Sequence, residues 1–173
     1  MNNLLKSYPN FRDIGGLETT SGRKLKSEVL FRSGFLSKLE GEDLETFKRL
    51  GIEKVIDLRT NEETALLGQG NYPENTEYCN IPLNSGNITK MLIPIFEKGE
   101  FQLIEEGLLA KIYIEMISKL EKEIALVFRQ FLETDSSVVY HCSHGKDRTG
   151  LVSALFLDLM DVRREEIYQD YLK

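Results

Sequence analysis

The strongest chemical signal in the sequence is a ten-residue stretch, His141 to Gly150, that reads HCSHGKDRTG. It places Cys142 six positions before Arg148, between a β-rich run that ends at Tyr140 and an apolar helical pattern from Leu151 to Met160. A loop that opens a helix points backbone N–H groups inward, and the helix dipole adds about half a positive charge there. The stretch therefore predicts an anion-binding loop, whose positive field favours the thiolate form of Cys142.

The residue types in this loop match what the cleavage of a phosphate ester requires. Cys142 can attack phosphorus as a thiolate, and the planar fork of Arg148 can hold two phosphate oxygens at once. The hydroxyl of Thr149 can donate to the sulfur and ease its departure from a thiophosphate intermediate. The remaining loop residues supply backbone N–H groups for substrate binding; they are Ser143, His144, Gly145 and Lys146. His141 precedes the loop and is expected to orient it rather than to act as a base.

Composition and charge exclude several other classes of protein. A net charge of −6 over 173 residues argues against a nucleic-acid surface. No apolar run is long enough to span a membrane, and residues 1–10 lack an apolar core of signal-peptide length, so we expect no signal peptide. The spacing of His141, Cys142 and His144 is too tight for a metal site, so we expect no metal and no cofactor. The sequence carries no signal for an oligomeric state.

Two cysteines among 173 residues make a disulfide framework improbable and favour a reducing compartment, by default the cytoplasm. Cys142 lies in the predicted anion-binding loop. Cys79 lies in a predicted strand, where a buried apolar role is expected. The alternative for Cys79 is a resolving thiol that protects Cys142 as a disulfide.

Alternating strand and helix patterns predict an α/β fold, with a central, mostly parallel β-sheet flanked by helices on both faces. The expected strands are Val29–Phe31, Val55–Leu58, Glu77–Ile81 and Val138–His141. The expected helices are Ser37–Leu50, Asn61–Leu67 with Asn61 as its cap, Arg148–Met160, and one from Val162 or Arg163 that still runs at Lys173. Ligands of such sheets bind beyond the carboxyl ends of the strands, where both Asp57 and Cys142 are expected.

Residues 84–134 show no strand signal. Apolar residues recur every three to four positions from Leu109 to Phe131, which predicts one long helix or two that join near Ser118. The segment before it, Met91 to Leu109, is apolar but only weakly periodic. It is either packed on the body or forms a cover over the site.

The loop motif and three other segments resemble those of a known enzyme family. Cys-x5-Arg-Thr after a strand resembles the catalytic signature of cysteine-based protein tyrosine and dual-specificity phosphatases. The fuller string HCxxGKDRTG resembles that of the microbial tyrosine/lipid phosphatase subfamily, which includes secreted virulence phosphatases of bacterial pathogens. Three further segments carry the same resemblance: Asn10–Gly16, Leu30–Gly34 and Val55–Arg59.

The resemblance implies a phosphotyrosine-phosphatase-like fold and hydrolysis of phosphate monoesters through a phosphocysteine, without metal. The implied substrates are phosphoproteins, with phosphotyrosine first and phosphoserine or phosphothreonine next, and phosphoinositides. Lys146 resembles the extra loop cation of lipid phosphatases. Residues 84–134 correspond to a helical lid insertion within one domain over 1–173. Family members usually continue through further C-terminal helices, so we expect the domain to be incomplete, and secretion is a second implied location.

The chain departs from the family in the residue that would act as general acid. Most relatives carry an aspartate on the loop after the strand that matches Glu77–Ile81, whereas residues 82–87 here contain no carboxylate. Two candidates remain, Asp57 and Asp147, and Asp57 is favoured. A carboxyl group must be desolvated to stay protonated for this role. The alternatives are an ion pair of Asp57 with Arg59 or Arg12, and a structural bond of Asp147 within the loop.

Two other functions are compatible with a loop cysteine. A catalytically weak, phosphate-binding pseudophosphatase would capture phosphorylated partners, but Cys142, Arg148 and Thr149 are all intact. A sulfurtransferase or arsenate reductase also uses a loop cysteine. The Gly-Lys-Asp-Arg-Thr-Gly tail of the loop argues against this third function.

Overall fold

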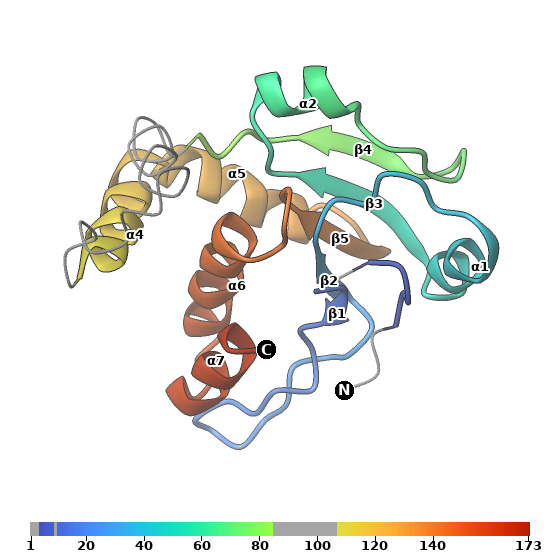
Figure 1. Ribbon diagram of the computed structural model, residues 1–173. Coiled ribbons are helices and arrows are strands. Elements are labelled where there is room, and N and C mark those ends of the chain that lie inside the picture. The colour runs from blue at the N-terminus through green and yellow to red at the C-terminus, as the bar shows by residue number, and fades with distance from the viewer. Residues whose placement is uncertain (1–3, 9, 85–106) are drawn as a thin grey trace.

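The sheet of this protein has five strands in the order β1-β2-β5-β3-β4. The computed structural model describes residues 4–8, 10–84 and 107–173. The strands are β1 (Arg12–Asp13), β2 (Leu30–Ser33), β3 (Ile52–Asp57), β4 (Glu77–Asn80) and β5 (Ser137–His141). Only the short β1 runs antiparallel to its neighbour, and the other three pairings are parallel (Figure 1). This confirms the predicted mostly parallel sheet.

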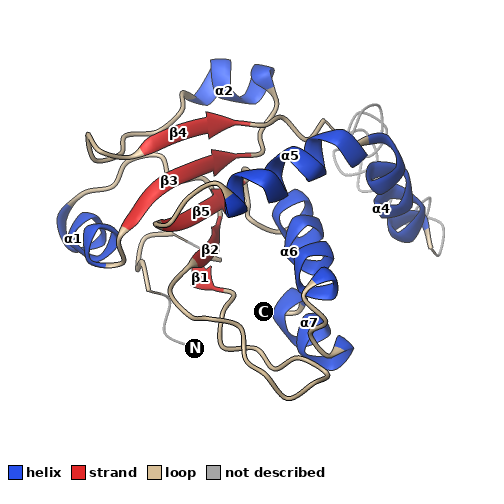
Figure 2. Cartoon of the chain, turned by 180° about the vertical axis from the view of Figure 1, so that it is seen from behind, coloured by secondary structure: helices blue, strands red, loops and turns tan. Residues whose placement is uncertain are grey.

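Helices flank the sheet on two sides. They are α1 (Gly41–Arg49), α2 (Asn61–Leu67), α4 (Leu108–Lys119), α5 (Glu121–Leu132), α6 (Asp147–Leu159) and α7 (Arg164–Tyr171). Helices α4 to α7 gather at one side of the sheet and α1 lies at the other, as Figure 2 shows. Among the described residues, no helix is long and apolar enough to cross a membrane.

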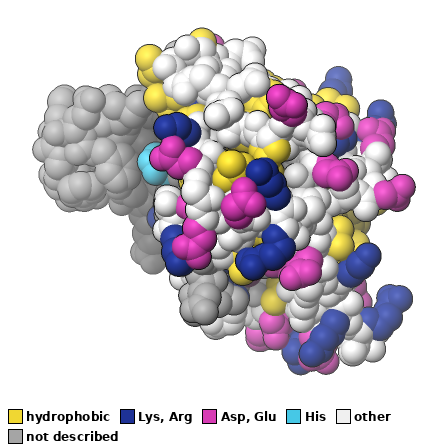
Figure 3. Space-filling model, turned by 90° about the vertical axis from the view of Figure 1, so that its right-hand side faces the viewer, with side chains coloured by type: hydrophobic (Ala, Val, Ile, Leu, Met, Phe, Trp, Pro, Cys, Tyr) yellow, Lys and Arg dark blue, Asp and Glu magenta, His cyan; other side chains and the backbone are white. Residues whose placement is uncertain are grey.

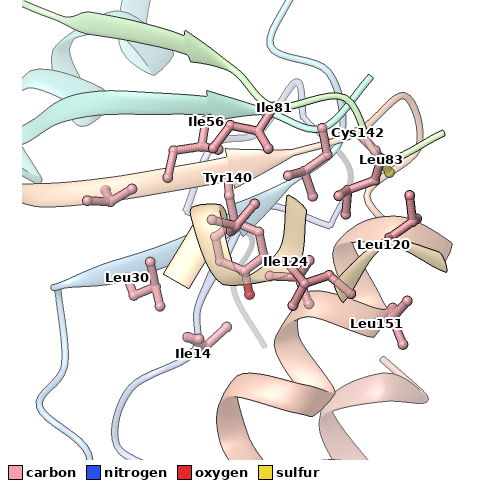
Figure 4. Close-up of a cluster of buried hydrophobic side chains, with 14 of the residues drawn as sticks. Ile14, Leu30, Ile56, Ile81, Leu83, Leu120, Ile124, Tyr140, Cys142 and Leu151 are labelled. Carbon is pink, nitrogen blue, oxygen red and sulfur yellow. The ribbon is translucent and has the colours of Figure 1, made fainter. Parts of the chain in front are cut away.

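Successive residues of the central strands feed two separate apolar cores, because neighbouring side chains in a strand point to opposite faces. In β5, Val138 and Tyr140 join the core beneath α5 and α6, whereas Val139 joins the core that includes Phe47 of α1. Figure 4 shows the first core, in which Tyr140 lies near Ile124 of α5. Two such cores explain why β5 reads as a continuous apolar run in the sequence.

Some predicted boundaries are wrong for identifiable reasons. Helix α1 begins at Gly41 rather than Ser37, because the carbonyl of Ser37 accepts from Asn71 N–H (3.2 Å) and Glu40 is extended. The cap of α2 is Thr60 rather than Asn61. Thr60 Oγ accepts from Glu63 N–H (3.3 Å), and the Glu63 carboxylate accepts from Thr60 N–H (2.9 Å), which is a reciprocal capping box.

The region predicted as a helical insertion contains two helices in its second half. Helices α4 and α5 meet at Leu120, two residues beyond the predicted joint at Ser118. The final helix α7 ends at Tyr171 rather than running through Lys173. The segment that was expected to cover the site falls largely in residues 85–106, outside the described residues, so the lid stays a prediction.

Acidic and basic side chains are interspersed over the face of the molecule that Figure 3 presents. No one-sign patch dominates that face. A positive site on this acidic chain is therefore a local feature, built by a few groups whose positions the fold determines.

Candidate active site

The carboxyl ends of the central strands lie in register and define one edge of the sheet. Ser33 of β2 pairs with His141 of β5, His141 pairs with Asp57 of β3, and Asp57 pairs with Asn80 of β4. The loop after β5, residues 142–146, leaves from this edge and leads into α6. The structure thus brings Asp57 and Cys142 to the same side, as expected from the fold logic.

The loop after β5 is built with its carbonyl groups turned outward. The carbonyls of His141, Ser143 and His144 accept from Leu58 N–H (2.8 Å), Phe35 N–H (3.0 Å) and Asn10 Nδ2 (2.8 Å) respectively. The Gly145 carbonyl accepts from Arg32 Nη2 at 2.8 Å. The Cys142 carbonyl lies 3.2 Å from His141 Nδ1. Each carbonyl is therefore engaged by the surrounding protein rather than by the loop itself.

The amide groups of the same loop remain available. None of the N–H groups of residues 143–148 donates to another group in the described parts of the chain. Because their carbonyls are held outward, these N–H groups converge at the N-terminus of α6, where the helix dipole is positive. Orphan N–H groups at a helix start are satisfied by an anion. This arrangement is an anion cradle around Cys142.

Gly145 is required by the close approach of the loop to β2. Its φ is 71°, and a Cβ atom placed on it would lie 2.5 Å from backbone atoms of Ser33 and Gly34. No L side chain fits there without moving one of the two segments. The glycine of the motif therefore allows the loop to curl tightly beside the sheet edge.

A buried charge cluster braces the cradle from behind. Asp170 of α7 pairs with Arg32 (2.7 Å) and Arg12 (2.8 Å), and all three side chains are largely shielded from solvent. Arg32 uses its other Nη to hold the Gly145 carbonyl. Burial would raise the pKa of Asp170, but the hydrogen bonds and charges of the two arginines lower it below its ordinary value. Arg12 and Arg32 therefore brace the loop, and their shared partner Asp170 is a residue that the sequence did not single out.

Cys142 lies on the floor of the cradle and is 3% exposed. Figure 4 shows it beside Leu83 at the end of the sheet. Thr149 is fully buried, and its Oγ1 finds no hydrogen-bond partner among the described residues. Burial lowers the pKa of His141 below its ordinary value, which favours a neutral imidazole. His141 thus contributes a hydrogen bond to the loop rather than a positive charge.

Arg148 is held by a carboxylate that the sequence did not single out. Its Nη1 and Nη2 donate to the two oxygens of Glu63 on α2, at 2.5 and 2.7 Å, and Ser143 Oγ donates to Glu63 Oε1 at 2.5 Å. Burial would lower the pKa of Arg148, but the bonds to Glu63 and the charge of Cys142 raise it. Burial would likewise raise the pKa of Glu63, whereas Arg148 and Ser143 lower it to about 2. The pair is charged at any neutral pH.

This grip leaves one edge of the guanidinium open. Arg148 Nε makes no hydrogen bond in the described part of the chain, and Nη2 reaches Ser143 Oγ only at 3.4 Å. A guanidinium can bind two oxygens through its Nε and Nη2 edge while its Nη1 and Nη2 end is paired. Glu63 therefore orients Arg148 and leaves it able to hold a second anion.

Asp57 lies at the edge of the site, and both of its carboxylate oxygens accept hydrogen bonds from neighbouring side chains. It is 0% exposed, and its oxygens accept from Arg59 Nε (3.0 Å), Arg59 Nη2 (2.6 Å) and Tyr78 Oη (2.9 Å). Burial alone would raise the pKa of Asp57, but the hydrogen bonds and the charge of Arg59 lower it below its ordinary value. The ion pair with Arg59 is the alternative that the sequence left open, and these contacts favour it over the acid role.

Asp147 occupies a different environment. It is the first residue of α6 and is exposed. Tyr113 Oη of α4 donates to its Oδ1 at 3.0 Å, so its partner comes from another helix rather than from the loop. Its Oδ2 makes no hydrogen bond in the described part of the chain.

The remaining predicted binding residues lie around the rim. His144 and Lys146 are exposed, and Lys146 pairs with no carboxylate in the described ranges. No cluster of three or more His, Cys, Asp or Glu side chains suited to a metal ion occurs among the described residues. Cys79 is half-buried in β4, and both cysteines are free thiols. Burial raises the pKa of Cys79, which favours its neutral thiol.

Glu63 and Tyr113 are the functional candidates that sequence reasoning missed. The Thr-x-x-Glu spacing of Thr60 and Glu63 is a capping-box signal, so the sequence could have predicted Thr60 as the N-cap of α2. That signal does not reveal the contact with Arg148, which is 85 positions away. Tyr113 reads in the sequence only as one more residue of an amphipathic helix.

The chain is similar in sequence to proteins of a known family. Residues 4–173 match the model of a family described as the tyrosine phosphatase family. Triple specificity protein phosphatase PtpB of Mycobacterium tuberculosis is 30% identical over 185 residues, covering 95% of this chain and 66% of that protein. A tyrosine-protein phosphatase of Nostoc commune is 26% identical over 152 residues, covering 85% of this chain and 48% of that protein. The chain thus spans about half to two thirds of the length of these relatives.

Solved structures of related fold were also found. P. aeruginosa TpbA aligns with a TM-score of 0.42 and 15% identity, covering 86% of this chain and 70% of that chain. The core catalytic domain of the PP-IP phosphatase SIW14 from S. cerevisiae aligns with a TM-score of 0.41 and 19% identity, covering 94% and 73% respectively.

Proposed function

Since the chain belongs to the tyrosine phosphatase family, we propose that it hydrolyses phosphate monoesters through a phosphocysteine formed on Cys142. The observation that carries the proposal is the anion cradle. Six amide N–H groups that donate to no other group among the described residues surround Cys142, and Arg148 lies at the rim with the Nε and Nη2 edge of its guanidinium accessible. A dianionic phosphoryl group satisfies both at once.

The first half-reaction forms a bond from Cys142 Sγ to phosphorus and breaks the bond from phosphorus to the ester oxygen. The loop N–H groups and the Nε and Nη2 edge of Arg148 hold the equatorial oxygens as charge develops on them. The ester oxygen leaves with a proton from a carboxylic acid. No metal is needed, because the positive charge comes from Arg148 and the start of α6.

The second half-reaction regenerates the enzyme. A water molecule attacks phosphorus and gives its proton to the carboxylate that served as the acid, so that inorganic phosphate forms. The bond from sulfur to phosphorus breaks, and the Thr149 hydroxyl, which lacks a partner in the described structure, donates to the departing thiolate. In the overall reaction, a phosphate ester and water give an alcohol and inorganic phosphate.

We assign the acid to Asp147 rather than to Asp57, which was favoured from the sequence. The buried Asp57 accepts bonds on both oxygens and its pKa is lowered, so it holds no proton at neutral pH. Asp147 is exposed in the free protein and has one oxygen without a partner in the described structure, so bound substrate must supply the desolvation that the acid role requires. Asp57 then serves as the counter-charge of Arg59 beneath the site.

The proposed substrate class begins with phosphotyrosine. The relative from Mycobacterium tuberculosis is called a triple specificity phosphatase, which supports a broader range that includes phosphoserine and phosphothreonine. Phosphoinositides are the second candidate, favoured by the exposed Lys146 beside the cradle, which pairs with no carboxylate among the described residues. Rates on a phosphotyrosine peptide and on soluble phosphoinositides compare the two directly, with Lys146→Met expected to lower only the latter.

A reducing compartment, the cytoplasm, is the proposed location, because Cys79 and Cys142 are both free. Secretion is the alternative carried by the family resemblance. The proposed partners are phosphorylated substrates, and residues 1–173 are proposed to belong to one catalytic domain.

The decisive experiment is turnover of an aryl phosphate by the unmodified chain and by Cys142→Ser. We expect turnover that is abolished by the substitution. Binding of phosphopeptide without any turnover by the unmodified chain would instead favour the pseudophosphatase. Asp57→Asn and Asp147→Asn, compared on activated and unactivated aryl phosphates, then identify the acid, since its loss matters least for the activated substrate.

A further inference from the structure

Three elements distant in sequence meet at Asp147 through two tyrosine hydroxyls. Tyr113 Oη of α4 donates to Asp147 Oδ1 at 3.0 Å, and Tyr113 Oη lies 2.7 Å from Tyr171 Oη of α7. The two rings pack edge to face, with centroids 6.4 Å apart. The hydroxyls therefore form a short chain from α7, through α4, to the first residue of α6.

The direction of the hydrogen bonds in this chain follows from the number of protons available. A tyrosine hydroxyl has one proton, and that of Tyr113 is used in the bond to Asp147. Tyr171 must then donate to Tyr113. Asp147 Oδ1 can still accept the bond from Tyr113 when the carboxyl group is protonated, provided that the proton is on Oδ2. The chain thus selects which oxygen of Asp147 carries the transferable proton.

The far end of the chain is anchored in the brace of the cradle. Tyr171 follows Asp170, whose carboxylate is bound by Arg12 and Arg32. The Tyr171 ring also packs on Gly150 of α6, where a Cβ would lie 3.0 Å from the ring. Arg32 in turn holds the Gly145 carbonyl. Helix α7 therefore supports the phosphate cradle through Asp170 and reaches the proposed acid through Tyr171.

We propose that Tyr113 is a positioning residue for proton transfer, which holds the Asp147 carboxyl with Oδ2 toward the leaving group and is itself aligned by Tyr171. The inference rests on the proposed function, because it assigns a role to a residue only through Asp147. Tyr113 itself transfers no proton. Burial, the bond to Tyr171 and the charge of Asp147 all raise the pKa of Tyr113, so its hydroxyl stays a donor across the working pH range.

The test compares Tyr113→Phe with the unmodified chain on two substrates that differ in the need for an acid. Phenyl phosphate has a poor leaving group, whereas dinitrophenyl phosphate leaves without a proton. We expect kcat/KM for phenyl phosphate to fall by about 3- to 10-fold, the value of one hydrogen bond to an uncharged group, because the acid is protonated. The value for dinitrophenyl phosphate should change by less than about 2-fold. The ratio of the two rates is independent of the fraction of folded protein.

Two further variants separate positioning from mere structural support. In an Asp147→Asn background, Tyr113→Phe should cause no further loss on phenyl phosphate, because the two changes remove one function. Tyr168→Phe is the matched control, since Tyr168 lies on α7, is 69% exposed and bonds to none of these groups. It should leave both rates unchanged.

The outcomes distinguish this inference from the function on which it rests. Equal losses on both substrates, or an undiminished loss in the Asp147→Asn background, overturn the role of Tyr113 while the phosphatase activity stands. A selective loss on phenyl phosphate that disappears in that background supports it. Absence of turnover by the unmodified chain overturns the proposed function and this inference together.

Discussion

The ion pair between Glu63 and Arg148 makes a quantitative prediction about stability and pH. The Glu63 carboxylate accepts from Thr60 N–H, from Ser143 Oγ and from both Nη atoms of Arg148. Together these bonds lower its pKa from 4.5 to about 2, although burial opposes them. Such a shift corresponds to about 3 kcal/mol in favour of the charged form. The side chain is 30% exposed, so solvent screening reduces the expected contribution to about 1–3 kcal/mol.

The sign of the pH dependence follows from the direction of the shift. A carboxyl group whose pKa is lower in the folded state stabilises the fold fully above its unfolded value, here 4.5. The contribution is lost as the pH falls from that value towards about 2. We therefore expect Glu63→Gln to lower the free energy of unfolding by about 1–3 kcal/mol near neutral pH. The difference from the unmodified chain should shrink steadily below about pH 4.5.

Urea unfolding of both proteins over a series of pH values measures this difference. Glu165→Gln is the matched control, because Glu165 also lies in the first turn of a helix but forms no ion pair in the described structure. It should show little difference at any pH. The same Glu63→Gln protein should turn over aryl phosphates about 10-fold more slowly, since Arg148 loses its orientation. A stability difference that is equal at neutral and acidic pH, or absent at neutral pH, would refute the reasoning.

Two more predictions follow from the cradle and the buried network beneath it. Gly145→Ala should lower the free energy of unfolding by at least about 2 kcal/mol and abolish turnover, since a Cβ would strike the backbone of Ser33 and Gly34. Urea unfolding with an aryl phosphate assay checks both effects, and wild-type activity would contradict them. Asp57→Asn leaves Arg59 buried without its counter-charge and should cost about 3–5 kcal/mol. Turnover per folded molecule should fall equally on activated and unactivated substrates, and a selective loss on the unactivated one would return the acid role to Asp57.

Local sequence patterns predicted most of the helices and strands. Helix α2 has the predicted bounds, and β2, β4 and β5 lie within two residues of their predictions, because apolar runs and helix signals are local properties of the chain. Strand β3 begins three residues before its predicted start at Val55. Helix α1 was extended too far because the contact that ends the preceding loop comes from Asn71, on a later segment. A predicted helix boundary is wrong where a residue distant in the sequence forms a hydrogen bond with a backbone group that the helix would otherwise use.

The cradle could be predicted from the loop string alone, but its supports could not. Glu63 meets Arg148 only because α2 follows β3, which lies beside β5 in a register that the sequence does not encode locally. Asp57 was favoured as the acid because it ends a strand at the site. Its complete burial and its bond from Tyr78 depend on the pairing of β3 with β5 and with β4, whereas its partner Arg59 lies only two positions away. Residue types identify the chemistry, whereas long-range packing decides which carboxylate is free to perform it.

The central claim is that Cys142 is the nucleophile within a phosphate cradle, and it is tested most directly by capture of the covalent intermediate. The protein is mixed with dinitrophenyl phosphate, quenched within the first turnovers, and digested for peptide mass spectrometry. The peptide that contains Cys142 should gain the mass of one phosphoryl group, and this adduct should be missing from Cys142→Ser. Turnover that proceeds without the adduct and survives Cys142→Ser would contradict the account.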